Sequence, residues 1–239
     1  MALPKLRVPE YFTKLPSNGK EIKFRPYLVG EQKTLLVAIE SKDVKEIYNA
    51  ILNIINECIL TPGIKAEKLA SYDVEWLFIK MREHSVGGQI ALMHNHVVDE
   101  EEFEVPVKVN LANVKYENPN VNNKILLEEE TGIGVVLKHP TLEMSLKISD
   151  FQEEMSQTEL TFKFVEECIE SIFDKDEVYT DFPDGYVHEF VNSMTETQRQ
   201  KVMAFFKDAP YVYLDISYIC PKTNNTINKR LSGITDFFI

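Results

Sequence analysis

The stretch SYDVEWLFIKMREHSVGG, residues 71–88, has the pattern of a helix that is packed against the rest of the chain. Ser71 can cap it, and carboxylates lie in its first turn, where the helix dipole favours them. Gly87 supplies a stop. Apolar residues recur at helical spacing, and such periodicity normally indicates burial: Val74, Leu77, Phe78 and Met81.

The segment before this stretch, Asp43–Ile59, offers a matching partner helix. Its apolar residues form one face: Val44, Ile47, Tyr48, Ile51, Ile54, Ile55 and Cys58. Asp43 with Glu46 resembles a capping box at the start of this helix. We therefore expect these two helices to pack together as the core of a globular domain.

The N-terminal part of the chain changes character twice before these helices. Residues Leu3–Pro16 carry three prolines and predict an extended lead-in without a core of its own. Glu21–Tyr27 alternates between apolar and charged residues, which is typical of a short half-buried strand. A helix is then expected over Glu31–Glu40, with its inward residues Leu35, Leu36 and Ile39.

After Gly88 the apolar period changes from helical to two. Residues 103–111 alternate as in a strand with one solvated face, and Ile90–Val98 is expected to pair with it across the acidic turn Asp99–Glu102. A second hairpin is predicted from 125–127 to 135–137, because glycines occupy the turn between them. Leu142–Ile148 fits a strand and a helix equally well.

From Gln157 onward the helical period returns. One helix is expected to continue as far as Phe173, and the stretch Ser193-Met194-Thr195-Glu196 is a capping-box signature before another. Tyr211–Cys220 alternates and predicts a terminal hairpin with Ile227–Leu231.

The expected fold class is therefore α+β: a helical body with an inserted small antiparallel β module and a C-terminal β-hairpin. The segments would be residues 1–88, 89–150 and 151–239, with the third packing on the first as one body. Two consecutive α+β halves are the alternative. A weak repeat points to them, since Asn56-Glu57-Cys58-Ile59 resembles Glu166-Glu167-Cys168-Ile169.

Composition excludes some functions and disfavours others. A net charge of −12 disfavours nucleic-acid binding, which needs basic surface to neutralise phosphates. We expect no membrane span and no secretory signal, because no apolar run is long enough. The three cysteines are far apart, which favours reduced thiols in a cytosolic compartment.

Catalytic motifs are missing from the sequence, and the strongest chemical candidate is His94-Asn95-His96. It places two imidazoles on one side of a strand, which is half of a metal site, but no third ligand has suitable local spacing. Solvent-facing histidines are the simpler interpretation. Cys58 and Cys168 lie on apolar helix faces, where a thiolate is disfavoured. We expect no enzyme activity, no cofactor and no metal, with a metal-dependent enzyme around His94 and His96 as the alternative.

Partner binding is the function class that remains, and both ends of the chain are candidates. The proline-spaced arm suits a segment that lies on a neighbouring protein, through Leu3, Leu6 and Val8. The terminal residues Phe237, Phe238 and Ile239 are unusually apolar, so they are either tucked into the domain or anchor a partner.

Several segments, taken in order, resemble the T4-type bacteriophage baseplate hub protein family over most of the chain, from about residue 2 to 239. The motifs are structural and individually loose: LPSNGK (15–20), IKFRPYL (22–28), DVEWLF (73–78), VVLKHPT (135–141), Cys220, Ser232-Gly233 and DFF (236–238).

The resemblance implies a hub component or hub assembly factor that acts by protein–protein contacts in the tail morphogenesis of a contractile-tailed phage. Its partners would be other phage baseplate hub and tail proteins, with no nucleic acid or membrane. It would act in the host cell cytoplasm during assembly, with the virion tail baseplate as a second location. A transient tail-assembly chaperone absent from the mature virion is the alternative.

The resemblance also implies paired cysteines, like a small metal ribbon, near the strand after residue 88 and near the C-terminal hairpin. Here the first region reads Met93-His94-Asn95-His96, and the second keeps only Cys220. No metal is expected.

Overall fold

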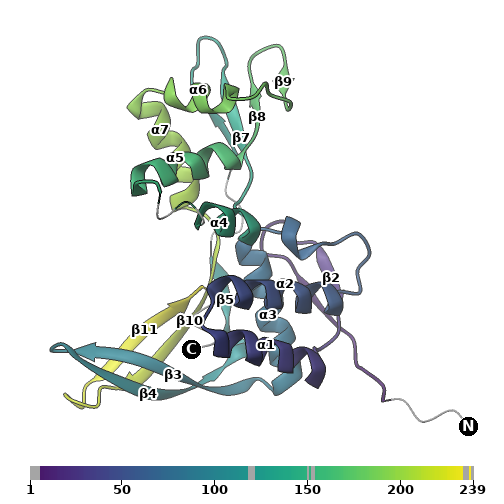
Figure 1. Cartoon of the computed structure of the whole chain (residues 1–239), viewed down its shortest axis with the longest axis vertical. Helices are drawn as coiled ribbons and strands as arrows, with labels where there is room; N and C mark the ends of the chain where they lie inside the picture. The colour runs from purple at the N-terminus through teal and green to yellow at the C-terminus, as the bar shows by residue number, and fades with distance from the viewer. Residues whose placement is uncertain (1–5, 118–121, 150, 152–153, 234–236, 238–239) are drawn as a thin grey trace, which may run out of the picture. The chain divides into compact units, whose positions relative to one another are not determined.

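The chain folds into two compact units (Figure 1). The computed structural model describes residues 6–117, 122–149, 151, 154–233 and 237. Unit 1 comprises Met1–Glu117 with Pro210–Ile239, and unit 2 is Asn118–Ala209. Helices and small antiparallel sheets are mixed along the chain, which confirms the α+β class.

Helix α3 (Ser71–Val86) is the central element of unit 1 and is buried on two sides. Its predicted face is completely buried, and α3 packs on α2 (Val44–Cys58), as expected. Tyr72 and Ile79 belong to a second core, shared with the strands of unit 1. Burial on both sides explains why the helix is apolar around most of its circumference.

That second core is formed by two long hairpins. The strands are β3 (Gln89–Val98) with β4 (Glu101–Asn110), and β10 (Tyr211–Ile219) with β11 (Thr226–Ser232). Figure 1 shows the two hairpins side by side, and β5 (Lys115–Glu117) pairs with β10 on the edge that β11 does not use. The residues buried between them alternate along each strand: Leu92, Val105, Val107, Val109, Val212, Leu214, Ile216 and Leu231.

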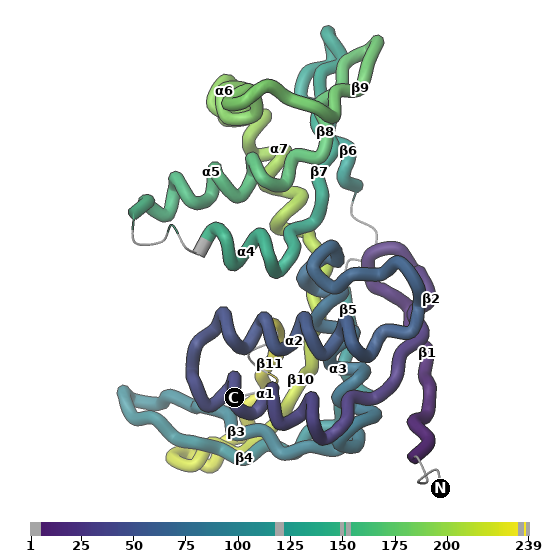
Figure 2. The backbone as a smooth tube through the Cα atoms, turned by 45° about the vertical axis from the view of Figure 1, so that its right-hand side comes forward, coloured from purple at the N-terminus to yellow at the C-terminus, as the bar shows by residue number. Residues whose placement is uncertain are grey.

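The N-terminal part of unit 1 is a hairpin followed by two helices. Strands β1 (Tyr11–Lys14) and β2 (Glu21–Phe24) pair, and α1 (Val29–Ser41) then packs along α2, as Figure 2 also shows. The chain leaves α2 at Cys58 and returns to β2, where Ile59 forms a bridge with Phe24.

The described residues of unit 2 form a four-stranded antiparallel sheet and four helices. The strands, in sheet order, are β6 (Lys124–Leu126), β7 (Gly134–Leu137), β8 (Ile169–Phe173) and β9 (Val178–Tyr179). The helices are α4 (Leu142–Ser149), α5 (Gln157–Cys168), α6 (Tyr186–Asn192) and α7 (Glu196–Lys207). Buried residues of the sheet, α5, α6 and α7 form one apolar core.

The two units contain the same motif: a hairpin, two helices, and a return to the second strand of the hairpin. We call residues 11–59 the first repeat and residues 124–173 the second repeat. Gly19 and Gly132 occupy the two hairpin turns, and Val29 and Leu142 begin the next helices; each pair is 113 positions apart.

In both repeats, an equivalent backbone hydrogen bond joins the end of the second helix to the residue that follows the second strand. Arg25 N–H donates to Cys58 O over 2.9 Å, and Lys138 N–H donates to Cys168 O over 2.8 Å. The two similar tetrapeptides of the sequence therefore mark equivalent positions, at the point where a helix ends and a strand contact begins.

Several local features differ from the sequence expectations. Helix α5 ends at Cys168, and the residues expected to extend it as far as Phe173 form β8, because they pair with β7. Leu36 was expected to point inward and is exposed. The cap of α7 is Thr195, whose side chain accepts from Gln198 N–H, so the capping box begins two residues after Ser193.

The compact units also differ from the expected segments 1–88, 89–150 and 151–239. An insertion is present, but the inserted part is Asn118–Ala209. The hairpin β3–β4 belongs to unit 1 because its apolar face is buried against β10, β11 and α3. Residues 157–207 belong to unit 2 because their helices cover the sheet formed by β6–β9.

Candidate functional site

The structure brings His94, His96 and Cys220 together at the two hairpins of unit 1. His96 Nε2 lies 3.2 Å from Cys220 Sγ, and Tyr218 Oη lies 3.0 Å from His96 Nδ1. His94 Nε2 lies 3.2 Å from the Lys229 amine. Both imidazoles occupy one face of β3, as the alternation predicted. They are half-buried and contact the Tyr218 ring, so the solvent-facing interpretation was wrong.

The pKa of the Cys220 thiol is lowered, whereas those of Cys58 and Cys168 are raised. Hydrogen bonds from Thr223 lower the pKa of Cys220 to about 6, with smaller contributions from Lys222 N–H and His96. A thiolate beside an imidazole has the composition of a nucleophilic pair. However, Cys220 is completely buried, so a substrate cannot reach the sulfur, and the cluster crosslinks the two hairpins.

Metal binding needs more donors than this cluster supplies. Among the described residues, no group of three histidine, cysteine or acidic side chains is placed to hold an ion. A structural zinc site takes four ligands and a catalytic one takes three. The residues present therefore do not fit the metal ribbon that the family resemblance raised.

The other two cysteines are structural. Cys58 and Cys168 end equivalent helices, are completely buried, and are free thiols. Burial raises the pKa of each thiol to about 12, so both stay protonated at neutral pH and neither is an activated nucleophile.

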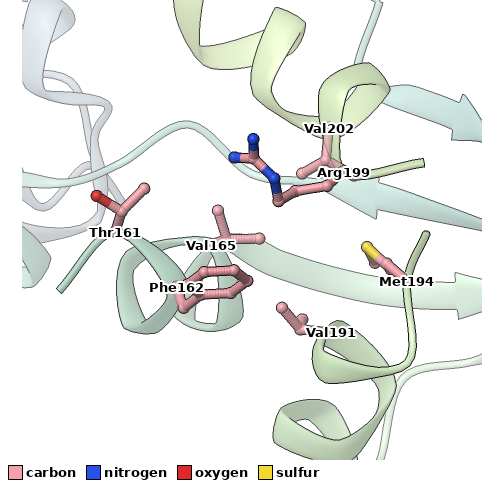
Figure 3. Close-up of a pocket in the computed structure, with 7 residues that line it drawn as sticks. All are labelled: Thr161, Phe162, Val165, Val191, Met194, Arg199 and Val202. Carbon is pink, nitrogen blue, oxygen red and sulfur yellow. The ribbon is translucent and has the colours of Figure 1, made fainter. Parts of the chain in front are cut away.

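Unit 2 contains a small apolar pocket between α5, α6 and α7 (Figure 3). It encloses about 260 Å³ of space, part of which is open solvent, and is lined by Thr161, Phe162, Val165, Val191, Met194, Arg199 and Val202. Its two polar side chains are already engaged. The Thr161 hydroxyl donates to Gln157 O, and the Arg199 guanidinium pairs with Glu196 at 2.6 Å. The pocket therefore offers no convergent polar groups for a substrate.

None of the helices in the described ranges combines enough residues with enough apolar character to span a membrane.

The N-terminal arm is the most exposed apolar segment among the predicted partner-binding residues. Leu6 is 97% exposed and Val8 is also exposed, whereas Leu3 lies outside the described residues. The arm leads into β1, where Phe12 is 60% exposed. Sequence reasoning missed Phe12, although its even number places it on the same side of an extended chain as Leu6 and Val8.

The C-terminal candidates divide differently. Phe237 is 1% exposed and belongs to the core of the two hairpins, and its carbonyl accepts a hydrogen bond from the Arg82 guanidinium. Of the two sequence alternatives for this residue, the structure supports the tucked one. Phe238 and Ile239 lie outside the described residues.

A second exposed apolar surface was missed entirely. Helix α1 exposes Val29, Leu36 and Val37, whereas Leu35 and Ala38 face α2 and the core. The signal was present in the sequence, because the apolar residues of α1 occur on both sides of the helix.

Comparisons with known proteins identify a family. A family described as T4 bacteriophage base plate protein matches residues 8–239, which is nearly the whole chain. No curated protein and no solved structure matches.

Proposed function

Because this chain belongs to the T4 bacteriophage base plate protein family, we propose that it is a hub component or hub assembly factor of the baseplate. It acts by protein–protein contacts during tail morphogenesis in a contractile-tailed phage. Its partners are other baseplate hub and tail proteins, and no catalytic step is part of the proposal.

The observation that carries this proposal is the exposed apolar arm that precedes β1. Leu6, Val8 and Phe12 are all exposed, and the described residues cover hardly any of the Leu6 side chain. Burying Leu6 against a partner stabilises a complex by about 1.5–3 kcal/mol before the costs of association, and Val8 and Phe12 contribute less because they are already partly covered.

The backbone of the arm supports the same proposal. Within the described sheet, β1 pairs with β2 on one edge, so its other edge is available to a neighbouring strand. Peptides often bind by adding a strand to such an edge, with alternate side chains providing specificity. Leu6, Val8 and Phe12 have the spacing of such alternate side chains.

A co-expression pull-down tests the proposal. The full chain is expressed with each of the phage's other hub and tail-tube-initiating proteins, and we expect at least one to be retained. The double variant Leu6→Asp/Val8→Asp is expected to lose that partner, because carboxylates in an apolar contact are strongly unfavourable.

The matched control is Val178→Asp, which places one carboxylate on another exposed apolar residue, in β9. This variant is expected to retain the partner. Binding to none of the hub proteins contradicts the proposal, and equal loss of binding in the control contradicts the role of the arm.

Mass spectrometry of purified virions separates the two forms of the proposed function. A hub component is found in the finished particle at a fixed ratio to other baseplate proteins. An assembly factor is present in infected-cell lysate and absent from virions, which is the behaviour of a transient chaperone in the host cytoplasm.

A further inference from the structure

Helix α1 carries two apolar faces, and the described residues cover only one of them. At about 100° per residue, Val29, Leu36 and Val37 fall on one side of the helix, opposite Leu35 and Ala38. The outer three are 81%, 50% and 57% exposed. Lys33 and Glu40 are exposed on the same outer side. We call these five residues the α1 stripe.

The second repeat shows that the fold does not require an apolar outer face at this position. Helix α4, the equivalent of α1, buries Leu142, Met144 and Ile148. Its exposed side is polar, with Lys147 and Glu143 paired at 2.7 Å. The α1 stripe is therefore a feature of the first repeat alone.

The order of residues along the α1 stripe is complementary to itself. When two copies of α1 lie antiparallel about an axis between Leu36 and Val37, residue numbers that face one another add to 73. Leu36 then meets Val37 of the second copy, and Lys33 meets Glu40 of the second copy. The contact between Lys33 and Glu40 is attractive, and the two-fold axis makes it twice.

We propose that the α1 stripe is a homodimer interface, in which two copies of this chain pack α1 against α1 in antiparallel orientation. Leu36 and Val37 lie at the centre, the Lys33–Glu40 pairs flank them, and Val29 lies outside these pairs, at the start of α1. The stripe has no net charge, so the two surfaces can approach closely although each chain carries a net charge of −12.

The size of the surface sets the expected affinity. One helix pair centred on Leu36 and Val37 of each copy is smaller than the roughly 800 Å² per partner of a standard stable interface. We therefore expect a weak dimer with a dissociation constant in the micromolar range or weaker, populated at high concentration.

Sedimentation equilibrium of the full chain over a wide concentration range tests the proposal. The apparent mass is expected to rise from the monomer value of 27.6 kDa toward twice that mass. Leu36→Asp is expected to abolish the rise, because it places two carboxylates beside the two-fold axis. Its circular dichroism and thermal unfolding check that the exposed substitution leaves the fold intact.

A charge-exchange series tests the orientation. Lys33→Glu and Glu40→Lys each turn two attractive contacts into repulsive ones, so each is expected to weaken self-association about tenfold or more. The double variant Lys33→Glu/Glu40→Lys is expected to recover it, and so is an equimolar mixture of the two single variants. Lys20→Glu changes the net charge equally, outside the α1 stripe, and is expected to associate like the unmodified chain.

Two results overturn the proposal. One is a chain that stays monomeric at every concentration at which it is soluble. The other is self-association that Leu36→Asp and both single charge variants leave unchanged. Recovery of self-association in the mixture of single variants supports the antiparallel arrangement. If neither the mixture nor the double variant recovers self-association, the antiparallel arrangement is wrong.

Discussion

The first and second repeats share a backbone plan but differ in what surrounds them. In both, a buried strand residue precedes the helix pair: Phe24 in the first and Leu137 in the second. The first repeat makes one bridge between Phe24 and Ile59, and the chain then departs for α3. In the second, Ile169–Phe173 pairs with both β7 and β9 and completes a sheet.

This difference shows which features belong to the motif and which to its context. The buried cysteine at the helix end, its hydrogen-bonded carbonyl and the buried second and fourth residues of the second strand occur in both repeats. The polar outer face of α4 and the apolar outer face of α1 do not correspond. Because the backbone plan is the same in both repeats, the fold does not fix the polarity of these outer faces, and a function specific to one repeat can.

The largest expected effect comes from truncating the buried side chain at the end of the second strand of each repeat. Phe24→Ala is expected to lower the free energy of unfolding by about 3–5 kcal/mol, and Leu137→Ala by about 2–5 kcal/mol, through lost contacts and a residual cavity. Urea denaturation measures the loss, and hydrogen exchange locates it in unit 1 or unit 2.

The control for Phe24 is Phe12→Ala in the same hairpin, where the ring is exposed and the expected change is within about 0.5 kcal/mol. A similar loss at Phe12 and Phe24 contradicts the assignment of Phe24 to the core.

The next test compares the first residue of the second strand in each repeat, which is a tightly packed glycine in one repeat and an exposed glutamate in the other. A Cβ at Gly134 would lie 2.2 Å from the Phe173 ring and 2.5 Å from Ile125 O, so Gly134→Ala is expected to cost about 1–3 kcal/mol. Glu21, 113 positions earlier, is exposed, and Glu21→Ala is expected to change stability by less than about 0.5 kcal/mol. Thermal unfolding of both variants checks this, and equal costs contradict the difference in packing.

Helix caps provide a smaller test in which the repeats are expected to agree. The Asp43 side chain accepts from Lys45 N–H at the start of α2, and Ser156 forms a capping box with Glu159 at the start of α5. Asp43→Ala and Ser156→Ala are each expected to cost about 1 kcal/mol in chemical denaturation. Asp43→Asn keeps the acceptor, and its unfolding free energy is expected to stay within a few tenths of a kcal/mol of the unmodified chain. A loss as large as that of Asp43→Ala argues against capping.

The smallest expected effect concerns a contact that the first repeat makes with α3. Asp73 is buried and accepts from Ser17 N–H in the hairpin turn, and burial raises the pKa of its carboxyl above the ordinary value. The folded state then binds the proton more tightly than the unfolded state. Stability therefore falls as the pH rises from the unfolded pKa of about 3.9 through the raised folded value.

Asp73→Asn keeps an acceptor for Ser17 N–H and removes the titration. The difference in unfolding free energy between the variant and the unmodified chain is expected to grow in favour of the variant across that pH window. Urea denaturation at several pH values measures it, and curves that stay parallel rule out the effect.

Local periodicity predicted elements more successfully than their arrangement. The α2 and α3 faces and the β3–β4 and β10–β11 hairpins follow from spacing alone, since each is amphipathic or alternating. The end of α5 at Cys168 could not be predicted, because Ile169–Phe173 fits both periods and only pairing with β7 decides for a strand. Spacing also cannot show that β4 and β10 meet, because they are about a hundred residues apart.

The candidate surfaces were predicted unevenly for the same reason. Leu6 and Val8 were recognised because prolines and the absence of a local core mark an arm. Leu36 was placed inward, because an apolar residue next to Leu35 carries no local sign of which side of α1 is covered.

The place where unit 2 interrupts unit 1 has a consequence for synthesis on the ribosome. Strands β5 and β10 are direct neighbours, with Glu117 opposite Tyr211, so the inserted unit begins and ends at one pair of residues. Unit 2 is therefore complete and free to fold while unit 1 still lacks the strands that bury α3 and β4. The core that β3, β4 and one side of α3 share with β10 and β11 can therefore form only after unit 2 has been synthesised.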